Sequence, residues 1–451
     1  MTKRVPVRLL LVALTALAGW RTVKAQPSVA LPELTFKRLL NDLPVTSAAL
    51  GGQGGEMLAA VAIRYGSVFD PADKSGLAYL TSRLIGKATL DRTGKDIKDE
   101  LDYLGASLDV RCDWDGIRFT LRCPGPVYER ALLLLYQVVA EAVFNEEDLN
   151  RTRQELLKEL EAPPDPRQRI LRQFETVLFR GTSYGRALRG TPASIRAVTA
   201  GDIRLFHRRF FIPNEAALVV ASNIPPAQLL QKITRIWGIW VRKDEVPFTF
   251  APPRTPAARN IYLEDDPSSP AAQFILGNLW PRRDDPSYYA ASIAARILQE
   301  RLTKALPTSL VTVASEGRKL PGPFYMQGQA AADQAVAQIA QILDIAESIK
   351  SSGVTTDEVA EVQNRWLTEF TASVTTQEGL CNMLLDAELY HLGTNYGVAL
   401  ADYVRRCDPD AVKLAAKDWL IPGGVVVLMR GPAGVLKPLL EPLGTVQSLA
   451  P

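Results

Sequence analysis

The chain has 451 residues, of which 47% are hydrophobic and 22% are charged, and its formal net charge is +3. This length predicts two or three domains, and this composition is that of a globular protein with a sizeable core, which excludes disordered and fibrous classes. Since the chain is nearly neutral and lacks basic clusters, nucleic acid is not expected as a partner.

The N-terminal segment has the features of a secretory signal peptide. Basic residues precede the apolar run LLLVALTALAG, which is too short to span a bilayer, and the small-residue site VKA follows before Gln26. We expect cleavage after Ala25, which would remove residues 1–25 and lower the net charge to about −2. The mature chain would then be periplasmic or secreted, without stable membrane insertion. An uncleaved N-terminal anchor is the alternative.

The pattern of apolar and turn residues in the next 200 positions predicts both strands and helices. A strand-like region (46–66) is followed by a helix (75–89), a strand pair that turns at 113–116, a long amphipathic helix (127–144) and a charged helix that opens at the acidic run 145–148. Further helices, an Ile-Pro turn and the buried strand AALVVAS (216–222) complete this part.

The second part predicts the same succession. Strand-like runs (258–280), a helix (287–306), a strand pair that turns near Glu316 and Gly317, and a long helix (335–353) precede the closing helices and the strand GVVVLMRG (424–431). A stretch rich in Pro and charge separates the two parts. We therefore expect domains at 35–236 and 259–447, joined by a linker at 237–258.

The two parts are an internal duplication. RGTSYGRAL (180–188) recurs as LGTNYGVAL (392–400), FHRRFFIPNEAALVVAS (206–222) recurs as LAAKDWLIPGGVVVLMRG (414–431), and Glu159 matches Glu369. The three matches keep their order and nearly the same spacing, which indicates homologous halves. Because strands and helices come in runs instead of strict alternation, the fold class is α+β, with two homologous α/β-sandwich domains.

Two stretches carry a family resemblance. GSVFDP followed by SGLAYLTSRLIGKAT resembles the G-L-A-H-x-x-E-H-x-x-x-x-G-T region of the insulinase/pitrilysin family of zinc peptidases, and FHRRFFIPNEAALVVASNI resembles its F-H-x-x-Y-x-P-N region. The resemblance covers about residues 35–445. It implies a fold like that of the mitochondrial processing peptidase subunits, in which a two-domain chain forms half of a chamber.

The residues that matter for catalysis differ from the family motif. H-x-x-E-H supplies two zinc ligands and a glutamate that activates water. Here the matching residues are Tyr79, Ser82 and Arg83. Tyrosine is a poor zinc ligand at neutral pH, serine is no general base without help, and a guanidinium cannot lose its proton to bind metal. The resemblance therefore implies a degenerate site with no catalytic residue, no metal and no cofactor in this chain.

One acidic ligand of the family site has a counterpart. The family has its third zinc ligand, a glutamate, on a later helix, and the residue 76 positions after Arg83 is Glu159. We expect Arg83 to form an ion pair with Glu159 in place of zinc. The alternative is a surface glutamate with a purely structural role, which its duplicate Glu369 favours.

The histidines and cysteines predict no other metal site. His207 and His391 are the only histidines and stand in no paired motif, so we expect packing or capping roles. Cys112 and Cys123 flank the strand pair at positions too distant for a disulfide and are expected to be buried thiols. Cys381 and Cys407 lie on successive helical segments, and their pairing stays open.

The resemblance implies three functional hypotheses. The favoured one is a catalytically inactive homologue that completes a peptide-processing chamber with a homologous zinc-peptidase subunit or with a second copy of itself. The alternatives are a scaffold protein of the cell envelope and an active zinc metallopeptidase. In bacterial pairs of the resembled family, the role of the subunit without zinc depends on an Arg and a Tyr in its second half. Arg301 fits the first position and is a candidate peptide-binding residue, with a solvated helix charge as the alternative, whereas the Tyr position falls near Val311.

Overall fold

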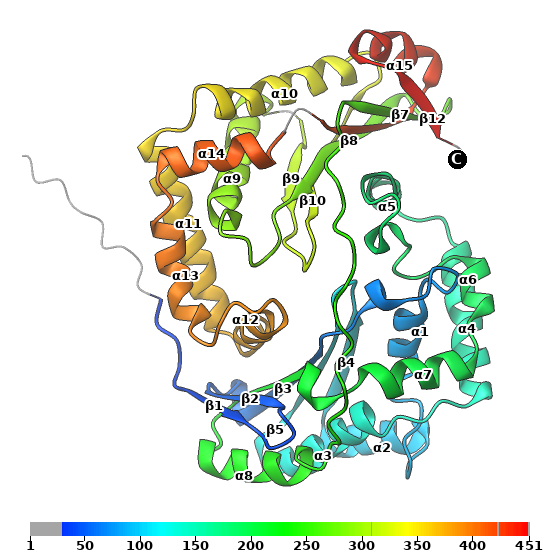
Figure 1. The fold of residues 1–451 in the computed structure, drawn as a ribbon, viewed down its shortest axis with the longest axis vertical. Coiled ribbons are helices and arrows are strands. Elements are labelled where there is room, and N and C mark those ends of the chain that lie inside the picture. The colour runs from blue at the N-terminus through cyan, green and yellow to red at the C-terminus, as the bar shows by residue number, and fades with distance from the viewer. Residues whose placement is uncertain (1–28, 308, 422–423, 450–451) are drawn as a thin grey trace, which may run out of the picture.

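The computed structural model describes residues 29–307, 309–421 and 424–449. The expected signal peptide and its cleavage site lie outside the described residues. Within them the chain forms two halves, each built around a sheet of six strands, so the predicted α+β class with two sheets is confirmed (Figure 1).

The first sheet has the strand order β1-β2-β6-β3-β5-β4. Neighbouring strands are antiparallel except for β2 and β6, which run parallel. The strands are β1 (Leu34–Arg38), β2 (Pro44–Ala49), β3 (Glu56–Ile63), β4 (Ser107–Cys112), β5 (Ile117–Pro124) and β6 (Ala216–Ser222). The predicted turn at 113–116 joins β4 to β5, where Asp113 accepts hydrogen bonds from the backbone of Asp115 and Gly116 at 2.8 Å.

Helices of the first half follow the predicted succession, with two shorter than expected. They are α1 (Leu77–Leu84), α2 (Gly94–Leu104), α3 (Tyr128–Ala140), α4 (Glu146–Glu161), α5 (Pro166–Leu178), α6 (Pro192–Ala197), α7 (Ala200–Phe210) and α8 (Pro226–Trp237). The prediction of a helix to Thr89 was wrong because Ile85 is extended and Gly86 takes a left-handed φ of 84°, which ends α1. The helix predicted to Phe144 ends at Ala140.

The second sheet has the order β12-β7-β11-β8-β10-β9. Its strands are β7 (Asn260–Asp265), β8 (Ala271–Trp280), β9 (Thr312–Ser315), β10 (Gly322–Ala331), β11 (Val426–Gly431) and β12 (Val446–Leu449). Its helices are α9 (Tyr288–Ala305), α10 (Ala335–Ser351), α11 (Thr356–Val374), α12 (Gln377–Leu389), α13 (Tyr396–Arg405), α14 (Pro409–Trp419) and α15 (Ala433–Leu440). Residues 238–259, between α8 and β7, contain no helix or strand.

The strand orders of the two sheets match, as the internal duplication requires. Strands β7 to β11 take the places of β2 to β6, and parallel pairing of β7 with β11 repeats that of β2 with β6. The outermost place differs, because the N-terminal strand β1 fills it in the first sheet and the C-terminal strand β12 fills it in the second.

One helix of each half packs on the sheet of the other half. Helix α5 of the first half packs on β8 and β11, and its counterpart α12 of the second half packs on β3 and β6 (Figure 1). The α12 contact includes three ion pairs, Arg64–Glu388 at 2.9 Å, Arg118–Asp386 at 2.6 Å and Arg122–Glu378 at 2.7 Å. The two sheets are therefore each covered by helices of both halves.

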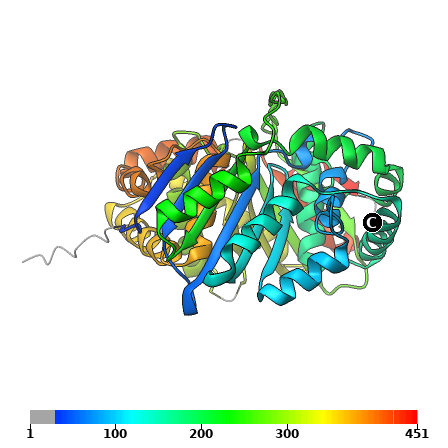
Figure 2. The ribbon, with the colours of Figure 1, turned by 90° about the horizontal axis from the view of Figure 1, so that it is seen from below.

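Alternation along β3 explains why one sheet has two apolar faces. Met57, Ala59, Val61 and Ile63 belong to the core that the first half builds with its own helices, some of which cover the sheet in Figure 2. Leu58, Ala60 and Ala62 belong to the other core, which includes Leu384 and Leu385 of α12. Side chains alternate between the two faces of a strand, so this continuous apolar run predicts a strand buried on both faces.

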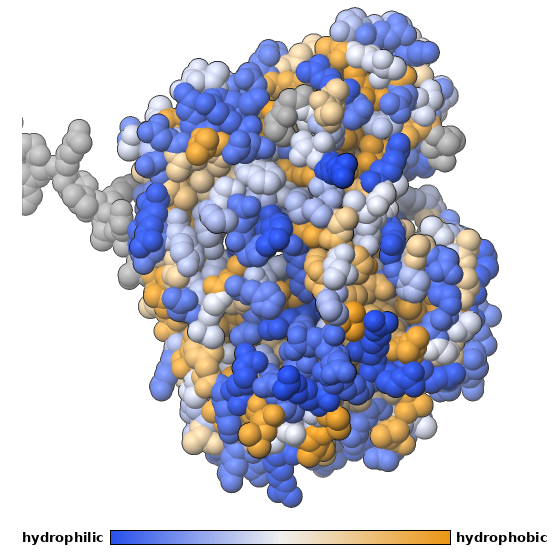
Figure 3. Space-filling view, in the orientation of Figure 1, coloured by the Kyte–Doolittle hydropathy of each residue, from blue (hydrophilic) through white to orange (hydrophobic). Residues whose placement is uncertain are grey.

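The surface carries both hydrophilic and hydrophobic residues. On the face drawn in Figure 3, hydrophilic residues cover most of the first half, and smaller hydrophobic areas lie between them. Among the helices of the described residues, none combines the length and the hydropathy needed to cross a bilayer.

Candidate functional site

Helix α1 starts at a rigid backbone turn. Gly76 has a left-handed φ of 87°, and a Cβ there would lie 2.7 Å from the backbone nitrogen of Gly190. The buried carboxylate of Asp70 accepts hydrogen bonds from the backbone of Gly76 at 2.8 Å and of Ala78 at 2.9 Å. Burial raises the pKa of Asp70 to about 7. The glycine and the aspartate thus explain why the GSVFDP…SGLA frame is needed to place this helix.

Tyr79 and Ser82, which the sequence resemblance aligns with catalytic positions of the family, are engaged in other contacts. The Ser82 hydroxyl donates to the carbonyl oxygen of Tyr79 at 2.7 Å, so its proton is held by its own helix. The Tyr79 ring lies under the guanidinium of Arg189, whose carbon is 5.5 Å from the ring centroid. The contact is a cation–π attraction between the guanidinium and the face of the ring.

Arg83 pairs with Glu159, as the spacing of the two residues predicts. Arg83 Nη1 donates to the two carboxylate oxygens of Glu159 at 3.0 and 3.2 Å, and Arg83 also lies 3.7 Å from Glu155. Arg189 donates a second hydrogen bond to Glu159. One carboxylate therefore bridges two guanidinium groups and ties α1 to α4 and to the segment after α5.

The second half contains an equivalent ion pair. Arg296 on α9 donates to Glu369 on α11 at 2.8 Å, and its guanidinium carbon lies 5.0 Å from the centroid of the Trp366 ring. An arginine and a glutamate thus recur at the positions of Arg83 and Glu159, and Trp366, the ring beside Arg296, lies on the helix that carries the glutamate. This recurrence supports the alternative that Glu159 and Glu369 have a structural role.

The two histidines lie apart from this helix. His207 Nε2 donates to the carbonyl oxygen of Val139 at 2.8 Å, and burial lowers its pKa to about 4. His391, exposed and with a left-handed φ of 54°, stands in the turn after α12, and partial desolvation lowers its pKa as well. Within the described ranges, no group of three or more His, Cys, Asp or Glu side chains is placed to hold a metal ion.

Arg301 is bound within its own half. Its guanidinium donates to both oxygens of Glu358 at 2.8 and 2.9 Å, to Ser348 at 3.1 Å and to the carbonyl oxygen of Gly353 at 3.1 Å. These bonds connect α9 with α10 and α11. Arg301 therefore has a structural role, since these hydrogen bonds within the second half occupy its donors.

The four cysteines are free thiols. Cys123, Cys381 and Cys407 are buried, and Cys112 is half-buried. Burial raises the pKa of the Cys381 thiol to about 12 and that of Cys407 to about 11, so both are protonated at neutral pH.

A cavity of about 830 Å³ lies between the two halves. Its wall includes residues of α12, Ser315 at the end of the edge strand β9, and four residues of the edge strand β4, namely Ser107, Leu108, Asp109 and Arg111. Many charged side chains in the wall are paired, for example Arg118 with Asp386 and Arg122 with Glu378. Edge strands present free backbone groups, which can pair with an extended peptide.

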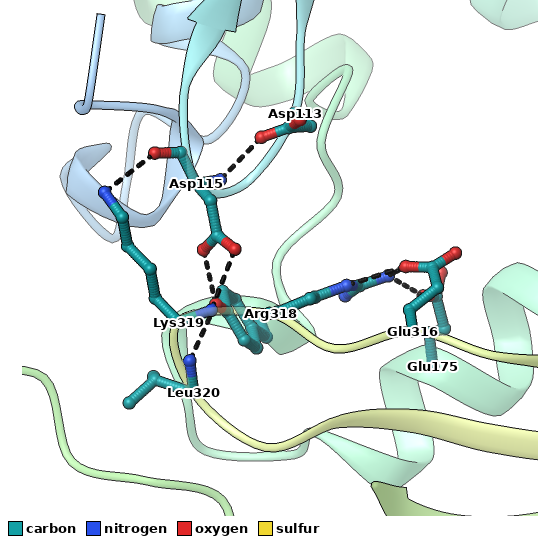
Figure 4. A network of polar contacts seen from close by, with 8 residues as sticks. Asp113, Asp115, Glu175, Glu316, Arg318, Lys319 and Leu320 are labelled. Carbon is teal, nitrogen blue, oxygen red and sulfur yellow. Dashed lines mark hydrogen bonds and ion pairs between the residues drawn. The ribbon is translucent and has the colours of Figure 1, made fainter. Parts of the chain in front are cut away.

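A buried polar network holds the halves together beside this cavity (Figure 4). Asp115, at the β4–β5 turn, accepts hydrogen bonds from the Tyr184 hydroxyl and from the backbone of Lys319 at 2.9 Å. The Lys319 ammonium donates to the carbonyl oxygens of Arg64 at 2.5 Å and Asp115 at 3.1 Å, and burial lowers its pKa to about 8.

Arg318 extends the network to α5. It donates to Glu175 at 2.8 Å and to Glu316, and its guanidinium carbon lies 4.1 Å from the centroid of the Trp114 ring. Sequence analysis identified Trp114 and Asp115 only as the tip of a strand pair. The signal that could have marked Arg318 and Lys319 is their place at the turn between β9 and β10, the counterpart of the β4–β5 turn.

Family models match the chain over two adjacent ranges. The model described as insulinase (peptidase family M16) matches residues 55–192, and the model described as peptidase M16 inactive domain matches residues 197–365. The chain belongs to the M16 family. The resemblance stated from the sequence is thereby confirmed.

The curated relatives have low sequence identity to the chain, and each match covers only part of both proteins. Cytochrome b-c1 complex subunit 1 of Bos taurus is 23% identical over 276 residues, which is 59% of this chain and 56% of the relative. An uncharacterized zinc protease of Rickettsia bellii is 20% identical over 187 residues, 41% of this chain and 45% of the relative. The chain thus spans about half the length of the curated relatives it matches.

Solved M16 structures share the fold over most of the chain. A peptidase M16 inactive domain from Pseudomonas fluorescens has a TM-score of 0.79 at 20% identity, covering 89% of this chain and 98% of that one. The periplasmic protease PqqL from Escherichia coli has a TM-score of 0.76 at 14% identity, covering 95% of this chain and 49% of that one. At these identities the likeness establishes the fold alone.

Proposed function

We propose that the chain is a catalytically silent M16 subunit that completes a peptide-processing chamber with a zinc-bearing homologue. The observation that carries the proposal is the double ion pair of Glu159 with Arg83 and Arg189. A guanidinium keeps its proton in proteins, so Arg83 is a fixed cation at a former ligand position and not a ligand. Zinc would belong to the partner, and this chain would need no cofactor.

The cavity between the halves supports a role in peptide binding. It measures about 830 Å³, and the edge strands β4 and β9 contribute to its wall. A homologous chain, or a second copy of this one, would close the open side of such a chamber. The signal peptide expected from the sequence supports a periplasmic or secreted localisation.

The test compares the chain alone with the chain and its partner. The full chain is purified from its native cell with bound proteins, its zinc content is measured, and peptidase activity on quenched peptides is recorded with and without a chelator. We expect no stoichiometric zinc in the isolated chain, and activity that appears only with a copurifying M16 chain that has an intact H-x-x-E-H motif. Zinc and chelator-sensitive activity in the isolated chain would overturn the proposal and favour an active metallopeptidase.

A scaffold role in the cell envelope is the second candidate. The observation in its favour is the match to cytochrome b-c1 complex subunit 1, whose name places that relative in a larger complex. Copurification with a large envelope assembly that lacks an H-x-x-E-H chain, together with the absence of peptidase activity in the assembly, would decide for the scaffold.

A further inference from the structure

A smaller pocket lies beside the network that joins the halves. It has a volume of about 290 Å³ and lies between α5 and residues 184–190. Its apolar wall is formed by Trp114, Leu160, Leu171, Tyr184 and Leu188. Trp114 also lines the large cavity, so its indole is a shared wall between the two spaces. A pocket of this size and lining fits one large apolar side chain with its main-chain atoms.

Three arginines line this pocket. Arg172 is exposed on α5, and Arg186 donates to the carbonyl oxygen of Asp70, but within the described residues neither forms a salt bridge. Arg189 is paired with Glu159. The acid in the lining, Glu175, is already bound by Arg318 at 2.8 Å. Arg172 and Arg186 are therefore the guanidinium groups at the pocket that have no salt-bridge partner among the described residues, and they favour an anionic ligand.

Two buried donors in the wall lack an acceptor. Trp114 Nε1 and Arg189 Nε have almost no exposed surface and no hydrogen-bond partner among the described residues. A buried donor without an acceptor costs free energy, and most such groups in folded proteins are satisfied. Neither donor is exposed to the pocket, so an acceptor in the pocket would satisfy one of them only after a shift of the wall.

We infer that the pocket binds an apolar residue with a free carboxylate, which is the chemistry of the C-terminal residue of a peptide. The apolar wall takes the side chain, and the guanidinium groups take the carboxylate, for which arginine is well suited. The chemistry of the ligand follows from the pocket alone. Its identity as a peptide rests on the proposed function, which it deepens by naming the end of the peptide that the chain holds.

The test measures binding of small probes to the full chain by calorimetry. N-acetyl-L-leucine is compared with N-acetyl-L-leucinamide, which keeps the side chain and removes the charge, and with octanoate, which keeps the charge on an unbranched acyl chain. We expect saturable binding of the acid at least fivefold tighter than that of the amide, and tighter than that of octanoate. Since no partner is present, the result is independent of whether the chain assembles with a zinc peptidase.

Variants on α5 localise the binding. Arg172→Gln removes an exposed charge from the pocket and should weaken acid binding about fivefold while leaving amide binding unchanged. Arg167→Gln removes an exposed charge of the same helix outside the pocket and should change neither. Thr176→Trp fills the pocket from an exposed position and should abolish binding of both probes. Its melting temperature checks that the variant is folded.

Three results would overturn the inference. Equal affinities for the acid and the amide would mean that the pocket does not recognise the carboxylate. Tighter binding of octanoate would assign the pocket to lipid-derived acids. An unsaturable titration, or equal effects of Arg172→Gln and Arg167→Gln, would mean that this pocket is not the site.

Discussion

Arg189 donates a hydrogen bond to Glu159 and is the second guanidinium on that carboxylate, after Arg83. In the second half, Glu369 is paired with Arg296 alone among the described residues. The carboxylate of Glu159 is therefore held by two arginines, whereas its counterpart Glu369 forms an ordinary cross-helix pair.

The first prediction compares the two glutamates. Glu159→Gln leaves Arg189 without its carboxylate and Arg83 with only the more distant Glu155, so we expect the free energy of unfolding to fall by about 1 kcal/mol, a value limited by solvent screening of this partly exposed site. Glu369→Gln should cost less than about 0.5 kcal/mol. Urea unfolding of both variants measures the difference, and equal costs would mean that Arg189 contributes nothing.

The second prediction concerns metal binding. Tyr79→His with Arg83→His places two imidazoles at i and i+4 on α1, next to Glu159, which is the ligand set of a three-residue zinc site. We expect the double variant to retain about one zinc per chain after gel filtration, measured by elemental analysis. Adding Glu159→Gln should remove it. If the double variant stays free of zinc while its melting temperature is unchanged, the frame no longer has the geometry of the family site.

The third prediction is a pH dependence of stability that His207 causes. Its pKa is about 4 in the folded chain and near 6.5 when unfolded, because burial disfavours the imidazolium. The unfolded chain therefore binds this proton more readily, and the contribution to stability is complete above pH 6.5 and is lost as the pH falls toward 4. We expect a loss of roughly 3 kcal/mol between pH 7 and pH 4 from this residue.

Urea unfolding at each pH, with two histidine variants, identifies the source. His207→Phe keeps an aromatic ring between Phe144 and Phe211 and should flatten the dependence. His391→Asn tolerates the left-handed backbone at that position and should retain most of it. A dependence that survives in His207→Phe would assign it to other groups.

The fourth prediction concerns the network between the halves. Arg318→Met leaves the largely buried Glu175 without its cation, and breaking a buried pair in this way costs about 3 kcal/mol. Removing both charges, by Glu175→Gln with Arg318→Met, should be less destabilising than Arg318→Met alone. The exposed pair Arg282–Asp284 offers a control, since Arg282→Met should cost less than about 0.5 kcal/mol. A double variant less stable than the single one would contradict the ion-pair account.

The Arg83–Glu159 contact could be predicted because the family resemblance assigns both residues to one site. The end of α1 could not, since apolar spacing continues past Leu84 and only the backbone of Ile85 and Gly86 stops the helix. The contact between Asp115 and Lys319 could not be predicted from the sequence either. These residues lie 204 positions apart in the chain, and nothing in either local sequence specifies the other.

The partner of α5 illustrates the same limit. Its sequence PRQRILRQFETVL has an apolar stripe with Ile170, Phe174 and Leu178, which predicts a helix with one buried face. Periodicity does not say which sheet this face meets. In the structure it meets the sheet of the other half, since these residues share a core with Ile275 and Leu428.

Because α5 and α12 are exchanged, the covalent link through residues 238–259 is not what keeps the halves associated. A chain cut in this segment would yield two pieces, each of which carries a layer of the other's core. Neither piece is then an autonomous folding unit, and the pair would behave as a split protein that reassembles only when both fragments are present.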